Sequence, residues 1–218
     1  ADHDCVSYCG TGSILLERWL NVSGSNVTDL TSNANYPNNP SQSLEITSFT
    51  GGSNIAENYG SRARGYLTPS LSGYYLFNLT SDDQGELYLS TDANPANKAL
   101  IASVSGWTEF NEYTKFPTQT SVEIYLIAGQ NYYVEVLHKE GGGGDHFLVS
   151  WETPTMTTWD VIPGTNLRPI RCAEICGNGV DDDVDGLTDC ADTNCSSSVT
   201  LSTPVVSGCI NQPLQDIA

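Results

Sequence analysis

Residues 73–92 read Gly-Tyr-Tyr-Leu-Phe-Asn-Leu-Thr-Ser-Asp-Asp-Gln-Gly-Glu-Leu-Tyr-Leu-Ser-Thr-Asp, two apolar segments separated by a polar turn. The first segment, 73–80, partly alternates apolar with polar residues, and the second, 85–91, is rich in strand-forming side chains. Alternation and aromatic content of this kind are typical of β-strands. The pattern therefore predicts two strands, with Asp82 and Asp83 side by side in the turn between them.

Short segments of the same texture recur along the chain, separated by clusters of Gly, Asn, Asp and Pro that favour turns. Long helical patterns are absent; we expect a helical turn at 96–102 and an irregular loop at 33–43. We predict an all-β protein, an antiparallel β-sandwich with a small Cys- and Asp-rich C-terminal extension. The further strands are expected at 121–127, 131–138 and 146–152.

The texture of the sequence changes after Pro154, where Thr- and Pro-rich residues precede a block rich in Cys and Asp. We expect a β-sandwich domain at 12–163 and a separate extension at 172–218. An extension of this length is too short for a large hydrophobic core, so metal ions and disulfides are expected to organise it.

The charge balance excludes one class of partner. The chain has 218 residues, with 8 Lys and Arg against 26 Asp and Glu, so its formal net charge is −18. Such a protein repels phosphate backbones, and we expect no nucleic-acid partner. No segment approaches the length of about 18 apolar residues that spans a bilayer, so direct membrane insertion is not expected either.

Cysteines lie only near the two ends of the chain. Their clustering predicts disulfides that fasten flanking segments, which fits an extracellular, secreted or cell-surface protein. Zinc binding is the alternative, but the C-x3-C and C-x4-C spacings and the distant histidines do not favour it. The seven are Cys5, Cys9, Cys172, Cys176, Cys190, Cys195 and Cys209.

An acidic loop in the extension matches a twelve-position calcium motif, with acids at positions 1, 3, 5, 9 and 12 and Gly186 at position 6. A solvated acidic linker is the alternative interpretation. The motif resembles the calcium repeats of dockerin-like or thrombospondin-like segments, and we expect it to stiffen the extension. Its expected ligands are Asp181, Asp183, Asp185, Leu187, Asp189 and Asp192.

A second candidate calcium site combines the Asp82-Asp83 turn with the glycine-rich segment 138–146. Four consecutive glycines carry a large backbone-entropy cost unless close approach or unusual dihedral angles require them. Ca²⁺ binds carboxylate and carbonyl oxygens, and an ion shared by two loops can leave coordination positions open to a ligand. The alternative is a solvated hairpin turn, because Asp favours turns for its own hydrogen-bonding reasons.

The order of motifs over about residues 12–155 resembles the PA-14 domain, named for anthrax protective antigen. Members of that family fold as β-sandwiches and occur in flocculins, in bacterial adhesins and as modules attached to glycosidases. The resemblance is carried by Glu17-Arg-Trp19, Asp29-Leu30, Glu57-Asn-Tyr-Gly60, Arg64-Gly-Tyr-Leu67, Gly73-Tyr-Tyr75, Ser81-Asp-Asp83, the segment 86–92, Trp107-Thr108, the segment 132–141 and Gly144-Asp-His146.

In the lectin members of that family, an Asp-Asp pair joined by a cis peptide and a second loop hold Ca²⁺, and sugar hydroxyls complete the coordination. The resemblance implies that Asp82 and Asp83 are this pair and that Asp145 and backbone carbonyls supply the second loop. The loop differs from the flocculin version, in which an Asn and an aromatic residue occupy it. The implied metal ligands are Asp82, Asp83, Gly142, Gly144 and Asp145, and the implied sugar-binding residues are Asp82, Asp83, Asp145 and His146.

We therefore expect a secreted, Ca²⁺-dependent carbohydrate-binding module, part of a larger multidomain chain, whose partners are cell-surface or extracellular glycans. The alternatives are an accessory module of a polysaccharide-degrading enzyme and a structural spacer of a surface protein. Catalysis by this chain is not expected. No nucleophile motif is present, and Ca²⁺ would keep the paired carboxylates ionised, whereas a catalytic acid needs a raised pKa.

Overall fold

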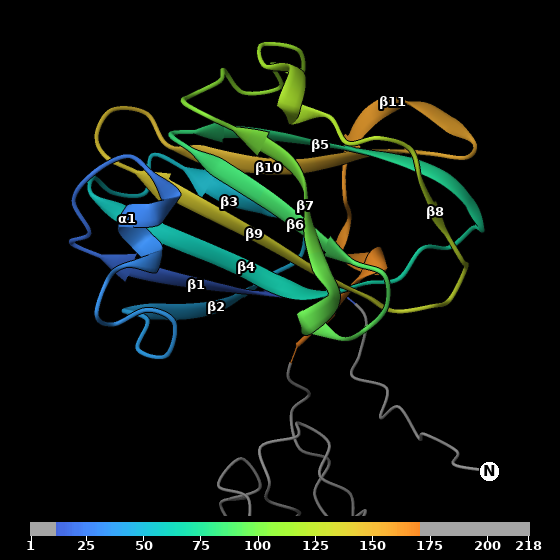
Figure 1. Ribbon diagram of the computed structural model, residues 1–218, viewed down its shortest axis with the longest axis horizontal. Helices are drawn as coiled ribbons and strands as arrows, with labels where there is room; N and C mark the ends of the chain where they lie inside the picture. The colour runs from blue at the N-terminus through green and yellow to red at the C-terminus, as the bar shows by residue number, and fades with distance from the viewer. Residues whose placement is uncertain (1–11, 171–218) are drawn as a thin grey trace, which may run out of the picture. The chain divides into compact units, whose positions relative to one another are not determined.

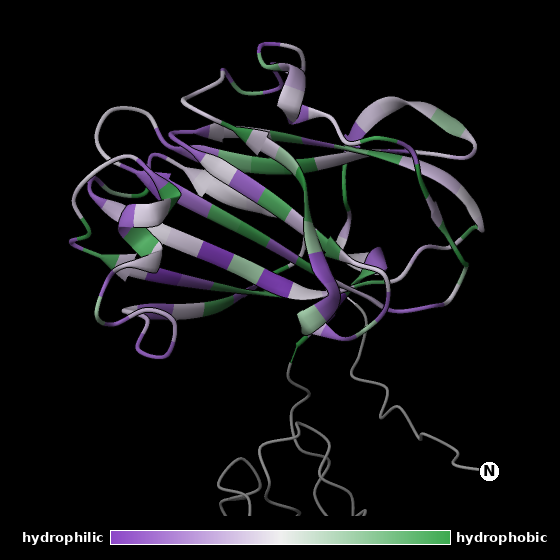
Figure 2. Ribbon diagram, viewed as in Figure 1, coloured by the Kyte–Doolittle hydropathy of each residue, from purple (hydrophilic) through white to green (hydrophobic). Residues whose placement is uncertain are grey.

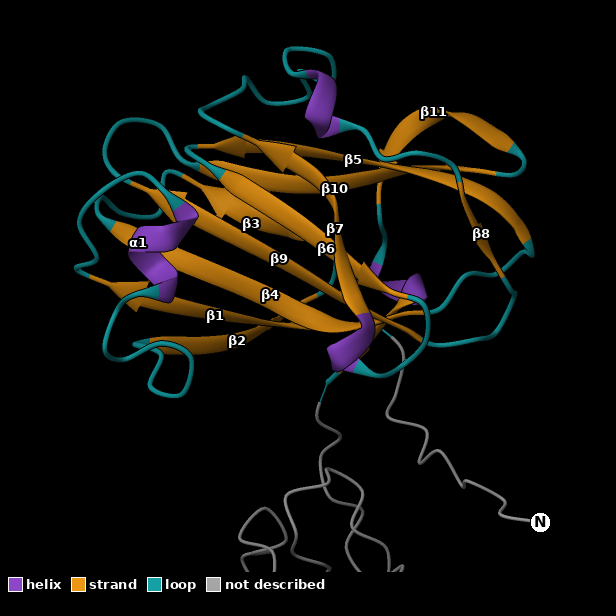
Figure 3. Ribbon diagram, viewed as in Figure 1, coloured by secondary structure: helices purple, strands orange, loops and turns teal. Residues whose placement is uncertain are grey.

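The computed structural model describes residues 12–170, which form two β-sheets packed face to face (Figure 1). All described strand pairs are antiparallel, and the helices are short (Figure 3). The seven-stranded sheet runs β2 (Gln42–Ile46), β1 (Ile14–Leu20), β4 (Tyr59–Leu67), β9 (Tyr132–Glu140), β6 (Gly85–Ser90) and β7 (Lys98–Val104), with β12 (Leu167–Pro169) paired to β4.

The five-stranded sheet covers the inner face of the first. It runs β11 (Met156–Val161), β10 (His146–Thr153), β5 (Gly73–Asp82) and β8 (Ile124–Leu126), with β3 (Thr50–Ser53) paired to β10. The helical elements are α1 (Val27–Thr31) and three 3₁₀ turns, η1 (Pro95–Asn97), η2 (Pro117–Gln119) and η3 (Gly164–Asn166).

Alternating side chains build the core between the sheets. Phe77 and Leu79 of β5 face Val134 and Val136 of β9, and all four are fully buried. Figure 2 shows the alternation as bands of hydrophobic and hydrophilic residues along the strands. Trp19 packs in a smaller cluster outside this core. The sequence alternates with a period of two, so each strand has one apolar face. The two sheets bury these apolar faces against each other.

The predicted all-β sandwich is confirmed, as are the strands expected from the opening segment. The helical turn expected at 96–102 is wrong: the structure has a 3₁₀ turn at Pro95–Asn97 and then strand β7. Pro95 sets this turn, and the β-branched residues that follow favour a strand. The irregular loop expected at 33–43 ends earlier than predicted, because β2 begins at Gln42.

Two chain crossovers between the sheets position the candidate site residues. β5 and β6 are consecutive in sequence but belong to different sheets, and so do β9 and β10. Because β5 pairs with β10 and β6 pairs with β9, the two crossovers are neighbours at one end of the sandwich. The register matches Asp82 with His146 in one sheet and Gly85 with His138 in the other. The Asp82-Asp83 turn is therefore a crossover rather than a hairpin.

The calcium loop predicted at 181–192 and all seven predicted disulfide cysteines lie outside the described residues. Strand β12 belongs to the sandwich although it follows residue 163, the end that the sequence predicts for this domain. Among residues 12–170, no helix combines the length and the hydropathy needed to cross a bilayer.

Candidate metal and ligand site at the crossover loops

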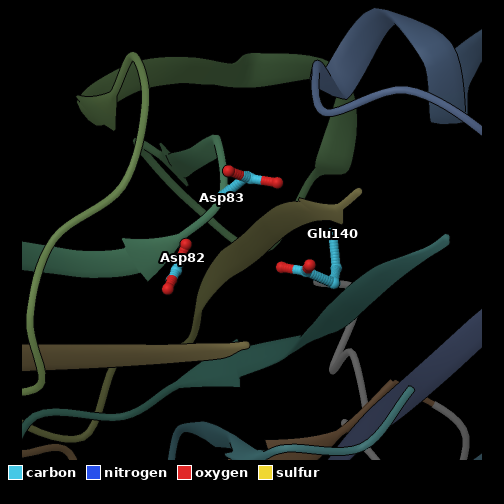
Figure 4. A group of neighbouring side chains, drawn as sticks. All are labelled: Asp82, Asp83 and Glu140. Carbon is cyan, nitrogen blue, oxygen red and sulfur yellow. The ribbon is translucent and has the colours of Figure 1, made fainter. Parts of the chain in front are cut away.

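Three carboxylates meet where the two crossovers adjoin. Asp82 ends β5, Asp83 follows it in the crossover, and Glu140 ends β9; one oxygen from each lies within 4.8 Å of the other two. Glu140 points from the end of β9 toward the two aspartates (Figure 4). The Asp82–Asp83 peptide bond is cis, as the family resemblance implies. We call these three residues the acid cluster.

Glu140 is the most unusual member of the acid cluster. It continues the inward-facing row of β9 formed by Val134, Val136 and His138, and it is fully buried. Within residues 12–170, neither of its carboxylate oxygens has a hydrogen-bond partner. Burial, reinforced by the negative charge of Asp83, raises the pKa of Glu140 to about 7. A buried carboxylate without a partner is energetically costly in its ionised form unless a cation neutralises it.

Asp82, like Glu140, lies in surroundings that disfavour its ionised form. Its burial, followed by the charge of Asp83, raises the pKa of Asp82 to about 6, and the Lys115 ammonium opposes this shift. Asp83 is better accommodated, because its Oδ2 accepts a hydrogen bond from the Gly141 N–H at 3.0 Å. Within residues 12–170, no ion pair joins a basic side chain to the acid cluster.

His138 and Lys139 flank the cluster without neutralising it. His138 is fully buried, and this burial lowers its pKa to about 4, so the imidazole is neutral near pH 7. Its Nε2 donates to the backbone oxygen of Asp82 at 2.7 Å, which fixes the proton on that nitrogen. The Lys139 ammonium donates to the backbone oxygens of Gly24 and Glu140. His138 therefore holds the crossover in place rather than supplying charge.

The glycines of the second crossover allow it to lie against its neighbours. Gly143 has φ +119°, a conformation that side chains disfavour, and its N–H donates to Glu57 Oε2 at 3.0 Å. A Cβ on Gly141 would lie 2.3 Å from Ser25 Oγ. The glycine run thus shows both features that would justify its entropic cost: close approach at Gly141 and an unusual dihedral angle at Gly143.

Asp145 and His146, predicted from the sequence as ligand residues, lie next to the acid cluster but outside it. Asp145 is 3% exposed, and its Oδ2 accepts hydrogen bonds from the N–H groups of Ile55 and Ala56 at 2.6 and 3.1 Å. Its Oδ1 has no hydrogen-bond partner. The His146 ring packs 5.3 Å from the Phe110 ring, and its Nε2 also lacks a partner.

Of the residues predicted from the sequence, the structure brings Asp82 and Asp83 together in one cluster. Gly142 and Gly144 lie in the adjoining crossover, where a Cβ on Gly144 would contact Asp82 Oδ2 at 3.4 Å. Glu140 was missed. The alternation of β9 predicts that Glu140 is buried. Every second residue of the strand faces inward, and position 140 belongs to the same row as Val134 and Val136.

An aromatic loop closes one side of the site. Thr108 is buried, and its Oγ1 accepts from the Ser81 N–H at 3.0 Å, which ties the loop to the end of β5. Trp107 is 48% exposed beside it, with the Lys115 ammonium 3.1 Å from the ring centroid. The loop therefore presents an exposed aromatic ring and a cation next to Asp82.

Comparisons with known proteins place this fold in a family. The model of the PA14 domain matches residues 19–163, and the chain belongs to that family. A mouse N-acetyl-beta-glucosaminyl-glycoprotein 4-beta-N-acetylgalactosaminyltransferase 1 is 34% identical over 169 residues, which cover 75% of this chain but 16% of the transferase. The chain thus spans about a sixth of the length of that relative.

Solved structures confirm the fold. A PA14 sugar-binding domain from an RTX adhesin superposes with a TM-score of 0.55 at 14% identity, covering 73% of this chain and 99% of that domain. The Epithelial Adhesin 6 A domain from Candida glabrata, solved in complex with Galb1-3GlcNAc, has a TM-score of 0.52 at 11% identity and covers 76% of this chain and 91% of that chain. At these identities the likeness concerns the fold.

Proposed function

We propose that this chain is an extracellular, calcium-dependent carbohydrate-binding module. In this proposal Asp82, Asp83 and Glu140 hold Ca²⁺, and sugar hydroxyls complete its coordination. The observation that carries it is the acid cluster itself. Three carboxylates converge without a basic partner among the described residues, and both oxygens of Glu140 are buried without a hydrogen bond.

The chemistry of the acid cluster fits a hard divalent cation. Ca²⁺ takes six to eight oxygen ligands, so the three carboxylates of the acid cluster leave coordination positions for carbonyls, waters and a ligand. The carbonyls of Gly142 and Gly144 and the Oδ1 of Asp145 are the nearby protein oxygens that we include in the proposed site. The raised pKa values of Asp82 and Glu140 express repulsion and desolvation that a bound cation would offset.

Carbohydrate as the ligand is supported by the family. The RTX adhesin domain is described as sugar-binding, and the Candida adhesin domain was solved with Galb1-3GlcNAc. Vicinal hydroxyls can replace weakly held waters on Ca²⁺. We expect weak monovalent binding that avidity strengthens. We propose cell-surface or extracellular glycans as partners and a non-catalytic role for this chain.

A second candidate function is an accessory module of a larger carbohydrate-active enzyme. The observation in its favour is the transferase relative, of which this chain spans 16%. In that case the sugar site would direct an attached catalytic domain to its substrate. The structural spacer is the third candidate, and it differs from the others because it predicts calcium-dependent stability without glycan retention. The calcium loop proposed at 181–192 has that structural role in each case.

A glycan-array screen tests the proposal. The intact chain is applied in millimolar Ca²⁺ and again with a chelator, alongside Asp83→Ala and Glu140→Gln. We expect Ca²⁺-dependent retention that both substitutions abolish. Glu123→Gln, which removes the same charge at an exposed position, is the matched control and should retain the wild-type pattern. Retention of glycans by folded Asp83→Ala would contradict the placement of the site.

A further inference from the structure

Arg18 is a buried cation that has no carboxylate partner among the described residues. It continues the inward-facing row of β1 formed by Ile14 and Leu16, so its stem enters the edge of the core. The side chain is 8% exposed; its Nη2 donates to the Gly51 backbone oxygen at 2.7 Å, and its Nε is buried without a partner. No ion pair within residues 12–170 involves Arg18.

An unpaired buried guanidinium is unusual in this chain, in which acids outnumber bases by 26 to 8. Taking a charge out of water costs several kcal/mol unless a counter-charge or several hydrogen bonds compensate it, so buried charges are normally paired. The other buried arginine, Arg62, follows that rule: its Nε donates to Glu17 Oε2 at 2.8 Å. The Arg18 guanidinium, in contrast, donates a hydrogen bond to the Gly51 carbonyl.

Arg18 lines an open groove of about 500 Å³ between the edge strands β2 and β3. Leu44 and Ile55 supply apolar lining, and both are partly exposed at 37% and 40%. The Thr50 hydroxyl also lines the groove; it accepts from the Gly52 N–H at 3.3 Å and keeps its own proton to donate. Glu45 lines the groove too, yet it makes no ion pair with Arg18.

We propose that this groove binds the anionic group of an acidic saccharide, a carboxylate or a sulfate ester, with Arg18 as its counter-charge. A guanidinium fork matches either oxyanion, the Thr50 hydroxyl adds a donor, and the apolar lining suits the C–H face of a sugar ring. A polyanionic macromolecule is disfavoured, because the net charge of −18 repels it.

The groove adjoins the crossover site through one segment of chain. Ile55 lines the groove while its N–H bonds to Asp145, and Glu57 accepts from Gly143 in the glycine-rich crossover. The inference therefore deepens the proposed function: it names acidic saccharides as the preferred class of glycan and rests on the chain being a glycan-binding module. Binding of the anion at Arg18 itself needs no Ca²⁺.

The test is a titration of the intact ¹⁵N-labelled chain, followed at the arginine Nε–H signals in NMR spectra recorded with a chelator. The probes are glucuronate and galactose 6-sulfate, with glucose and galactose as neutral matches. The Arg18 signal, assigned by its loss in Arg18→Met, should shift saturably with one or both anions, with a dissociation constant on the order of 1 mM. Which anion acts identifies the carboxylate or the sulfate ester as the ligand.

Two variants keep the result interpretable. Arg18→Met should abolish the anion-induced shifts of the Gly51 and Gly52 amides while the chain stays folded, because removal of an unpaired buried charge offsets the loss of the hydrogen bond to Gly51. Arg18→Lys keeps the charge without the fork and should bind more weakly. Absence of any anion-induced shift, or equal shifts with the neutral sugars, would overturn the inference. Either result leaves Ca²⁺-dependent retention on the glycan array as a separate outcome.

Discussion

Strand β9 carries two buried glutamates whose surroundings differ. Glu135 is 2% exposed; it forms an ion pair with Lys98 and accepts a hydrogen bond from the Tyr133 hydroxyl at 2.6 Å. Glu140, five positions later on the same strand, is fully buried and has neither kind of partner. The first carboxylate is compensated from within the protein. The second has no such compensation among residues 12–170, and its pKa is raised to about 7.

A further compensated carboxylate lies on β1. Glu17 accepts hydrogen bonds from Arg62 and Arg64 at 2.8 and 2.9 Å, and the Arg62 guanidinium lies 5.4 Å from the centroid of the Trp19 ring. The outer face of the seven-stranded sheet thus buries charge in pairs, whereas the crossover end brings three acids together, of which Glu140 is buried. In our proposal this difference separates a structural charge network from a binding site.

The largest effect is expected from breaking the compensated network. Glu17→Gln leaves Arg62 buried without a counter-charge, and removing one partner of a buried pair costs about 3–5 kcal/mol. Urea denaturation of this variant should show a loss of that size. Glu45→Gln, an exposed change on the neighbouring strand β2, should stay within about 0.5 kcal/mol of the wild type.

The uncompensated cluster should respond in the opposite way. With a chelator present, Glu140→Gln should be at least as stable as the wild type, because it removes a buried, unpaired carboxylate. Calcium at 100 times its dissociation constant should stabilise the wild type by about 2.7 kcal/mol. Thermal denaturation should show that this gain is smaller in Glu140→Gln. Equal gains in the two proteins would place all calcium stabilisation elsewhere in the chain.

The pH dependence of stability should also distinguish the two regions. Without calcium, the pKa of Glu140 is raised to about 7 and that of Asp82 to about 6, above their values in the unfolded chain. Between about pH 4 and about pH 7 these two groups therefore bind more protons in the native state, and their contribution to stability falls as pH rises. Buried His138, whose pKa is lowered to about 4, contributes the opposite slope but is present in both proteins. Urea midpoints measured in a chelator should therefore fall more, or rise less, with pH in the wild type than in Glu140→Gln. Midpoints that change with pH in the same way in the two proteins would contradict the raised pKa of Glu140.

The smallest effect is expected from the glycine-rich crossover. A Cβ on Gly141 would lie 2.3 Å from Ser25 Oγ and 3.3 Å from Asp83 Oδ2, so Gly141→Ala should displace the crossover. We expect a loss of about 1 kcal/mol and weaker Ca²⁺ binding, measured by calorimetry. At Gly106 an added Cβ would meet nothing closer than 3.8 Å, and Gly106→Ala is the matched control.

The sequence predicts the strands well because each has one face buried in a common core. Segment 73–92 alone indicates β5, the turn and β6, and the Asp82-Asp83 pair follows directly from it. What local patterns do not contain is the sheet to which each strand belongs. A hairpin and a crossover have the same turn residues, so the meeting of two distant loops appears only in the structure.

The role of Asp145 illustrates the same limit. Its hydrogen bonds reach Ile55 and Ala56, about ninety positions away in sequence, and no periodicity encodes such a contact. The burial of Glu140, in contrast, can be predicted from the sequence, because Glu140 follows the same alternation of β9 as Val134 and Val136.

The central claim is that Glu140, unlike Glu135, is a calcium ligand. A crystal grown with Ca²⁺ and examined by anomalous scattering tests it most directly. We predict a peak between Asp82, Asp83 and Glu140, with carboxylate oxygens about 2.3–2.6 Å from the ion. A crystal with calcium bound elsewhere and no peak between these three carboxylates, or a peak that Glu140 does not contact, would contradict the account.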